Sequence, residues 1–373
     1  MSKLLTAKAS VLEKFQAPLQ LREFALPSRP ERGAVLVRIE MAGICGTDVH
    51  LWKGELPIAL PVILGHETVG RIEQLGEGVE TDWTGQPLRV GDRVTWNPSA
   101  ACGACYYCAE KRLPTRCTSR RAYGIGYRCD AAPHFLGGYA EFHYLRSRTT
   151  IFKLPDDLPT ESIIGAGCAL NTAIHGVERT GISWRDVVVV QGAGPVGIAA
   201  LAVAKSAGAS QVIVLGAPRH RLEMARRFGA DHVIDIDAVP SAGRIDAVRQ
   251  LTGGYGADVV LECVGAPVAV VEGMEMCRDG GKYLVLGHYC DAGPVSWNPH
   301  IVTRKQLTVI GSWSSEPRHL HAAIGFLRDN KERFPFAGMV SHRFPLEEAN
   351  EALATTAAWK SAKSVLVPGA VRG

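Results

Sequence analysis

The chain has 373 residues, of which 46% are apolar and 21% are charged, and its formal net charge is +4. This length allows two domains with sizeable cores, and so small an excess of basic residues argues against a nucleic-acid surface. No apolar run approaches the ~18 residues of a membrane span. The N-terminus has neither the apolar core nor the cleavage site of a secretion signal, so we expect a cytoplasmic protein with no membrane partner. Ten cysteines in such a chain favour metal binding over a disulfide framework.

The first segment with chemical character follows a predicted strand. Residues 34–40 are apolar and then alternating, and they lead into Cys45, with a helix expected to begin near Thr47 or Asp48. By itself, Cys45 fits a buried small apolar residue as well as a metal ligand. The nearby Thr47, Asp48 and His50 change this interpretation, because a polar cluster next to a thiol is unusual in a core.

The rest of the chain is organised around residues 60–70. A short apolar run leads to Gly65, and His66 and Glu67 then precede a further strand-like pattern. Taken singly, His66 is more typical of a structural histidine and Glu67 of a solvated carboxylate. As a pair at a strand end they suit a metal site. Strands are expected to follow at 71–76 and 90–94.

The strongest local signal is a group of four cysteines. Two residues lie between Cys102 and Cys105 and two between Cys105 and Cys108, and eight lie between Cys108 and Cys117. Four thiolates can enclose one tetrahedral Zn²⁺, which would be structural because no coordination position stays open. An iron–sulfur centre is the main alternative, since both suit four sulfur ligands. We expect this lobe to span residues 99–120.

Residues 118–136 are rich in arginine and aromatic side chains. They form either an ordinary surface loop or a segment that recognises an anionic group of the substrate. A strand is expected at 137–142, and two prolines beyond it, Pro155 and Pro159, indicate a domain boundary. Residues 160–181 are predicted to be helical. They include Cys168, which taken alone is more typical of packing than of metal binding.

A dinucleotide site is predicted in the second half of the chain. Residues 186–191 suit a strand buried on both faces, and a G-x-G-x-x-G motif and a helix over 198–205 follow directly. In this order, backbone N–H groups and a helix N-terminus can meet a pyrophosphate closely. The residues expected to bind the cofactor here are Gly192, Gly194, Pro195, Val196 and Gly197.

The end of the next predicted strand, 211–216, bears on the choice of cofactor. Where an acid would hold the ribose 2′-hydroxyl of NAD, this chain has Gly216. Arg219 or Arg221 can then pair with a 2′-phosphate, which favours NADP over NAD. The alternative is that both arginines belong to the exposed face of the following helix.

Strands and helices continue to alternate, which predicts an α/β fold with a doubly wound parallel sheet. We expect a helix at 222–228 and strands near 232–236, 257–263 and 282–287. After about residue 305 the pattern predicts a strand at 307–310, helices near 317–329 and 346–356, and a last strand at 364–367. This tail could return to the first domain. The expected domains are therefore 1–155 with 306–373, and 156–305.

Over essentially its whole length, the chain resembles the zinc-dependent medium-chain alcohol dehydrogenases. The matching segments are Cys45–His50, Gly65–Glu67, the four-cysteine lobe, Gly167–Leu170, Gly192–Gly197 and Lys360–Lys363. The resemblance implies a doubly wound Rossmann domain beside a mainly β, GroES-like catalytic domain. It also implies two zinc ions per chain, one catalytic and one structural, and a homodimer or homotetramer formed near 307–312.

The same resemblance assigns the catalytic zinc to three ligands, Cys45, His66 and Cys168. Glu67 would be a nearby carboxylate that can enter the coordination shell during ligand exchange. Asp48 would orient His66 from outside that shell.

The resemblance also implies hydride transfer between an alcohol, which gives an aldehyde or ketone, and NAD or NADP. Thr47 would take the alcohol proton and His50 would pass it to solvent, while Lys363 would approach the cofactor pyrophosphate. The chain departs from the best-known members at Gly46, where some have a basic phosphate contact, at Gly216, where Asp is usual, and in the eight-residue spacer before Cys117.

Two other functions are compatible with the glycine motif. A zinc-independent quinone or enone reductase of the same fold would need none of Cys45, His66 and Cys168, so their joint presence counts against it. A non-catalytic protein could use dinucleotide binding for sensing or for structure.

Overall fold

A computed structural model describes residues 5–369 of the chain. The first four residues, on which the expectation about a secretion signal partly depends, lie outside this range. The chain divides into two units, one of Met1–Cys168, Glu316–Arg328 and Phe336–Gly373, the other of Ala169–Ser315 and Asp329–Pro335. The first division lies within helix α2 (Thr160–Thr180), later than the expected 155/156. The second lies later than the expected 305/306, because strand β16 (Thr308–Gly311) pairs with β15 (Cys277–Val285) in the second unit, and residues 329–335 also belong to that unit.

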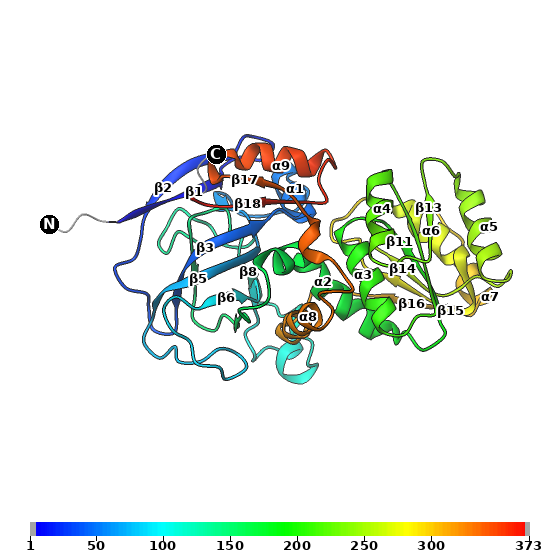
Figure 1. Ribbon diagram of the computed structural model, residues 1–373, viewed down its shortest axis with the longest axis horizontal. Coiled ribbons are helices and arrows are strands. Elements are labelled where there is room, and N and C mark those ends of the chain that lie inside the picture. Colours follow the sequence, from blue (N-terminus) through cyan, green and yellow to red (C-terminus); the bar gives the residue numbers. More distant parts are fainter. Residues whose placement is uncertain (1–4, 370–373) are drawn as a thin grey trace. The chain divides into compact units, whose positions relative to one another are not determined.

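The first unit is built on a seven-stranded mixed sheet, with strand order β10-β6-β5-β3-β18-β17 and β9 paired to β3 (Figure 1). Its strands are β3 (Val35–Gly43), β5 (Glu67–Leu75), β6 (Arg93–Trp96), β9 (Phe142–Leu145), β10 (Ile151–Lys153), β17 (Val340–Phe344) and β18 (Lys363–Leu366). The last strand of the chain, β18, lies antiparallel to β3, with Val365 opposite Gly43. The C-terminal tail therefore completes the sheet that the N-terminal part begins.

Smaller elements complete this unit. Two further sheets contain β1 (Thr6–Leu12), β2 (Gln20–Ala25) and β4 (Val62–Ile63), and β7 (Ser99–Ala100) and β8 (Arg121–Ala122). The helices are α1 (Gly46–Lys53), α8 (Pro317–Asp329), α9 (Ala349–Ala357) and the short η1 (Tyr106–Glu110), η2 (Pro114–Arg116), η3 (Phe336–Met339) and η4 (Leu346–Glu348). Helix α2 (Thr160–Thr180) continues into the second unit.

Two strand predictions in the first unit were wrong in their bounds. The strand expected at 90–94 begins only at Arg93, because residues 90–92 form a turn in which Gly91 has φ 91°. The strand expected at 137–142 begins only at Phe142. The residues before it form a close backbone contact instead, in which the Tyr139 N–H donates to the Leu64 carbonyl at 2.9 Å.

The second unit contains a six-stranded sheet of order β13-β12-β11-β14-β15-β16, and every neighbouring pair is parallel (Figure 1). The prediction of a doubly wound α/β sheet is thereby confirmed. The remaining strands are β11 (Val187–Gln191), β12 (Gln211–Gly216), β13 (His232–Asp235) and β14 (Ala257–Glu262). The helices are α3 (Pro195–Ser206), α4 (Arg219–Arg227), α5 (Ser241–Leu251), α6 (Pro267–Met276) and α7 (His300–Arg304).

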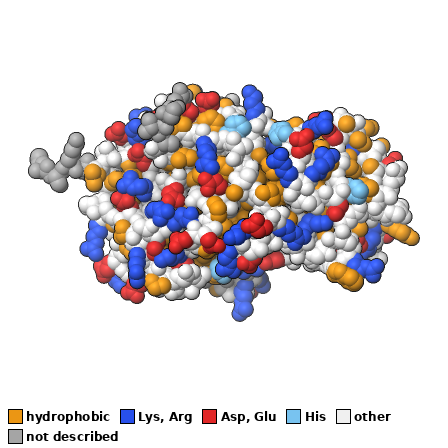
Figure 2. Space-filling model, viewed as in Figure 1, with side chains coloured by type: hydrophobic (Ala, Val, Ile, Leu, Met, Phe, Trp, Pro, Cys, Tyr) orange, Lys and Arg blue, Asp and Glu red, His pale blue; other side chains and the backbone are white. Residues whose placement is uncertain are grey.

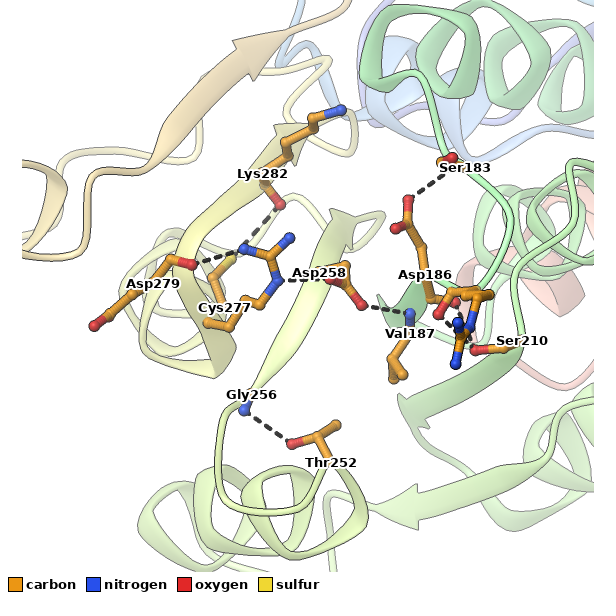
Figure 3. A network of polar contacts seen from close by, with 12 residues as sticks. Ser183, Asp186, Val187, Ser210, Thr252, Gly256, Asp258, Cys277, Asp279 and Lys282 are labelled. Carbon is orange, nitrogen blue, oxygen red and sulfur yellow. Dashed lines mark hydrogen bonds and ion pairs between the residues drawn. The ribbon is translucent and has the colours of Figure 1, made fainter.

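A carboxylate holds the central strands together where they begin. Asp258 accepts the backbone N–H of Val187 at 2.7 Å, and it also accepts Nε–H of Arg278 at 2.6 Å (Figure 3). This contact joins β14 to β11 at the amino ends of both strands. Their carboxyl ends, where ligands bind in such sheets, lie at the opposite edge.

The surface is charged without a dominant sign. On the face seen in Figure 2, acidic and basic side chains are intermixed, in keeping with the net charge of +4. Within residues 5–369, no helix has both the length and the apolar character that crossing a bilayer requires.

Candidate metal centres and dinucleotide site

Four potential metal ligands converge in the first unit. Cys45 is the second residue after β3 and is the N-cap of α1, which begins at Gly46, so the helix starts earlier than the expected Thr47 or Asp48. His66 immediately precedes β5, and Glu67 begins it opposite Gly43 of β3. Cys168 comes directly after a kink in α2. One ligand atom from each of Cys45, His66, Glu67 and Cys168 lies within 4.8 Å of the others, and the two Sγ atoms are 3.6 Å apart.

The kink that positions Cys168 lies at Gly167, with φ 51° and ψ −153°. Any side chain at this position would displace the Glu67 carboxylate, because an ideal Cβ would lie 2.4 Å from Oε1, and the positive φ also favours glycine. The backbone can therefore approach Glu67 closely, and the Cys168 N–H donates to Oε1 at 2.8 Å. The kink brings the thiol and the carboxylate to one place.

His66 is held from behind by a fully buried carboxylate. Asp48 Oδ1 lies 3.5 Å from His66 Nδ1, which leaves Nε2 of the imidazole to face a metal. Asp48 Oδ2 accepts the Cys45 N–H at 2.9 Å and the Tyr139 O–H at 3.0 Å. Burial opposes a charged imidazole, but the Asp48 carboxylate and Cys45 outweigh it and raise the pKa of His66 well above its usual value. Tyr139 was not predicted from the sequence, in which its one local signal is the pair of glycines before it.

Glu67 is paired with the ammonium of Lys363. Both side chains are almost fully buried, and Lys363 Nζ donates to Glu67 Oε2. Burial opposes the charged carboxylate, yet Lys363 and His66 lower the pKa of Glu67 to about 2. Glu67 is thus a carboxylate beside the metal site with a partner of its own. The expected contact between Lys363 and a cofactor pyrophosphate stays a prediction.

These residues fit a catalytic zinc. Two thiols and one imidazole are the ligand set of a zinc site that keeps its fourth position open, and the orientation of His66 by Asp48 is the usual support for such a ligand. The hydrogen bond between the two thiols lowers the pKa of Cys45, against burial and Glu67, and raises the pKa of Cys168, so Cys45 is the member of the pair that more readily becomes a thiolate.

Thr47 and His50 lie three residues apart on α1, so they are neighbours on the helix surface. His50 Nδ1 is bonded to the carboxylate of Glu55, and 43% of the His50 side chain is exposed. The hydrogen bond to His50 lowers the pKa of Glu55. His50 is therefore open to solvent and held in place by Glu55. The relay roles of both residues stay predictions.

The four-cysteine lobe forms a second cluster. Atoms of Cys102, Cys105, Cys108 and Cys117 lie within 4.8 Å of one another. Hydrogen bonds from the backbone of Thr118 and Cys108 lower the pKa of Cys105 to about 6, so this sulfur readily becomes a thiolate. The donor set and its compactness fit one tetrahedral metal ion with no open position.

The glycine motif in the second unit has the geometry of a phosphate cradle. It joins the end of β11 to α3, whose first turn begins with Pro195. An ideal Cβ on Gly197 would lie 1.8 Å from the Gly192 carbonyl oxygen, so the loop closes on itself at a distance that only glycine allows. A pyrophosphate can therefore approach both the loop backbone and the N-terminus of α3.

The structure distinguishes the two candidate arginines on α4. Arg219 is 85% exposed and pairs with Glu223 at 3.5 Å. Arg221 is half-buried, burial lowers its pKa, and its Nη1 lies 3.7 Å from an ideal Cβ on Gly194 of the glycine motif. Arg219 thus lies on the exposed face of α4 and Arg221 beside the cradle, and the cofactor contact of either arginine stays a prediction.

Gly216 ends β12 next to the same loop. An ideal Cβ there would lie 2.6 Å from Ala193 Cβ and 2.8 Å from Ala193 N. The position therefore excludes any side chain, and not merely an acidic one.

Comparisons with known proteins match both units. The family model for an alcohol dehydrogenase GroES-like domain matches residues 31–156, and that for a zinc-binding dehydrogenase matches residues 195–329. The 5-exo-hydroxycamphor dehydrogenase of Pseudomonas putida is 36% identical over 90% of this chain and 92% of its own.

Two solved structures share the whole architecture. An alcohol dehydrogenase of Thermotoga maritima is 36% identical, with a TM-score of 0.93 over 98% of this chain and 100% of that one. A structure from Sinorhizobium meliloti 1021, described as a zinc-binding dehydrogenase bound to NADP, is 29% identical, with a TM-score of 0.84 over 98% and 100%.

Proposed function

The chain belongs to the zinc-type medium-chain dehydrogenases, and from this membership we propose that it transfers a hydride between an alcohol and NAD(P), giving an aldehyde or ketone. The observation that carries the proposal is the convergence of Cys45, His66 and Cys168 within 4.8 Å, beside a carboxylate with its own partner. The substrate class rests on the relatives, two of which are named as dehydrogenases of alcohols.

The chain's own residues prepare the site for this reaction. When bound by the two thiols and His66, zinc supplies a Lewis acid that lowers the pKa of an alcohol. Asp48 fixes the ring of His66, and Lys363 holds the carboxylate of Glu67. Thr47 takes the alcohol proton, and the exposed His50 passes it to solvent.

The proposed metal content is two zinc ions per chain. Removal of one catalytic ligand tests the catalytic ion, because Cys45→Ala or His66→Ala should lower bound zinc from two ions to one and abolish turnover. The matched control is Cys129→Ala, since Cys129 is a buried thiol of the same unit outside both metal clusters. Metal analysis and an alcohol and carbonyl panel provide the readouts. Turnover without zinc at this site would instead support the zinc-independent reductase.

We propose NADP as the preferred cofactor. Because position 216 has no room for a side chain, no carboxylate there can repel the 2′-phosphate of NADP. Arg221 lies close enough to the glycine motif to pair with that phosphate. Arg221→Gln should weaken NADPH binding about tenfold and leave NADH binding unchanged, because a hydrogen bond to a charged group is worth roughly 1.5–3 kcal/mol. Arg219→Gln on the same helix is the control. Tighter NADH than NADPH binding by the unaltered protein would contradict the proposal.

We also propose a homodimer or homotetramer. Among residues 5–369, strand β16 pairs with a neighbouring strand on one side only, and Val309 on it is 48% exposed. Such an edge is a ready site for pairing with a second copy. Val309→Lys should give a smaller species in analytical ultracentrifugation. Six of the ten cysteines belong to the two proposed metal sites, which suits a reducing, cytoplasmic location as part of the same proposal.

A further inference from the structure

Glu262 bonds to two loops at the carboxyl edge of the six-stranded sheet. It is the last residue of β14, and its side chain is completely buried. Oε1 accepts the N–H groups of Val264 at 2.7 Å and Gly265 at 2.6 Å, and Oε2 accepts the N–H of Gly287 at 2.9 Å. Gly287 follows the neighbouring strand β15, so one carboxylate joins the loop after β14 to the loop after β15.

The two loops meet at backbone distance. An ideal Cβ on Gly287 would lie 2.4 Å from Gly265 N, 2.5 Å from Val264 N and 2.7 Å from Glu262 Oε1. No side chain separates the loops, and the carboxylate satisfies the N–H groups that their approach buries. No ion pair of Glu262 with a cation occurs in the described part of the chain, so its hydrogen bonds to these N–H groups fix where the loops lie.

The two loops lie at the edge of the sheet where a dinucleotide would bind. In a doubly wound sheet, the dinucleotide crosses the carboxyl edge where the strand order reverses, which here lies between β11 and β14. A dinucleotide bound in this way would have its adenosine half over β11 and β12 and its nicotinamide half over β14 and β15. The loop after β14 also adjoins the glycine motif, since an ideal Cβ on Gly192 would lie 3.1 Å from the Cys263 carbonyl oxygen.

We propose that Glu262 is a positioning residue for the nicotinamide half of the cofactor. It does not touch the cofactor, because it is buried beneath the loops whose backbone it orders. If an acceptor is removed, a buried N–H group loses its partner and the loops move, and small displacements at a reacting centre have large effects. The proposal rests on the function proposed above only in taking the ligand to be a nicotinamide dinucleotide.

The same strand provides a matched control. Asp258 lies near the other end of β14 and also accepts a backbone N–H, that of Val187, but at the amino edge of the sheet (Figure 3). Asp258→Asn removes a comparable structural contact far from the cofactor loops. It should lower stability without a selective effect on the nicotinamide half.

The experiment compares dissociation constants of full-length Glu262→Gln and Asp258→Asn for NADH, NADPH and ADP-ribose, which lacks the nicotinamide. Glu262→Gln should weaken NADH and NADPH binding about tenfold, the loss typical of a hydrogen bond to a charged group, and leave ADP-ribose binding unchanged. Asp258→Asn should change none of the three selectively. Equal losses for all three ligands in Glu262→Gln, or no loss, would overturn the proposal.

A second variant tests the loop arrangement without removing the carboxylate of Glu262. Gly287→Ala keeps Glu262 and forces the loops apart, so it should produce the same selective loss even if Glu262→Gln does not fold. Unchanged NADH and NADPH binding in a folded Gly287→Ala would refute the proposal. If the unaltered protein binds neither dinucleotide, the proposed function itself fails, which is a distinct result from a failure confined to the variants.

Discussion

The imidazole of His143 should make the stability of the protein depend on pH. It lies on β9, completely buried, with its ring centroid 4.7 Å from that of Trp96 and 4.8 Å from that of Tyr123. Neither ring nitrogen has a hydrogen-bond partner within residues 5–369. Burial lowers the pKa of His143 from 6.5 to about 3. The folded chain therefore keeps this ring neutral where the unfolded chain protonates it.

Proton linkage gives the size of the effect. Below pH 6.5 the unfolded state binds a proton that the folded state excludes, so the free energy of unfolding falls as the pH is lowered toward the folded pKa near 3. At 1.36 kcal/mol per pH unit, lowering the pH from about 7.5 to about 5 removes about 2 kcal/mol of stability. The unfolded pKa alone sets this figure, because the folded ring is still neutral at about pH 5.

His143→Phe should remove this contribution and retain the aromatic packing. Urea unfolding of both proteins at about pH 7.5 and about pH 5 should show that the unaltered protein loses about 2 kcal/mol more than the variant. A packing change in the variant contributes equally at both pH values, and titration of other groups contributes equally in both proteins. Both contributions therefore cancel when the pH-dependent losses of the two proteins are compared. His342→Gln, at an exposed imidazole of the same unit, is the control and should behave like the unaltered protein. Equal pH dependence of His143→Phe and the unaltered protein would refute the reasoning.

Three further substitutions and one double variant test the two proposed metal sites and the ion pair beside one of them. Tyr139→Phe removes the hydroxyl that donates to Asp48, and it should weaken the zinc affinity of the catalytic site about tenfold in a chelator competition. An unchanged affinity would contradict the role of Tyr139 in supporting Asp48 and His66. Cys105→Ser should lower zinc from two ions to one per chain and lower the unfolding temperature, whereas loss of both ions would show that the sites depend on each other. Lys363→Met leaves the buried Glu67 carboxylate unpaired and should lower the free energy of unfolding by about 3–5 kcal/mol. The double variant Lys363→Met, Glu67→Gln should recover part of that loss in the same denaturant titration, and an additive loss would argue against the pair.

The sequence determined the features that depend on local spacing. Four cysteines within sixteen residues need little chain closure to meet, and the structure brings them together. The strand, glycine motif and helix are consecutive in the chain, so their periodicity was enough to predict the parallel sheet. The starts of β6 and β9 were predicted less well, because a turn at Gly91 and a backbone contact of Tyr139 replace the expected first residues of these strands.

Only the tertiary structure decided how distant residues meet. Cys45, His66 and Cys168 had weak individual signals, and the register between β3 and β5 and the kink at Gly167 bring them into one site. In the same way, β18 brings Lys363 to Glu67 by pairing with β3.

The sequence showed that position 216 is a glycine where an acidic residue is usual. Only the structure showed that Ala193 leaves no room there for any side chain. Spacing along the chain fixes what neighbouring residues can do, because covalent geometry limits their separation. Contacts between residues a hundred positions apart depend instead on strand register and backbone packing, which the sequence encodes only through the whole fold.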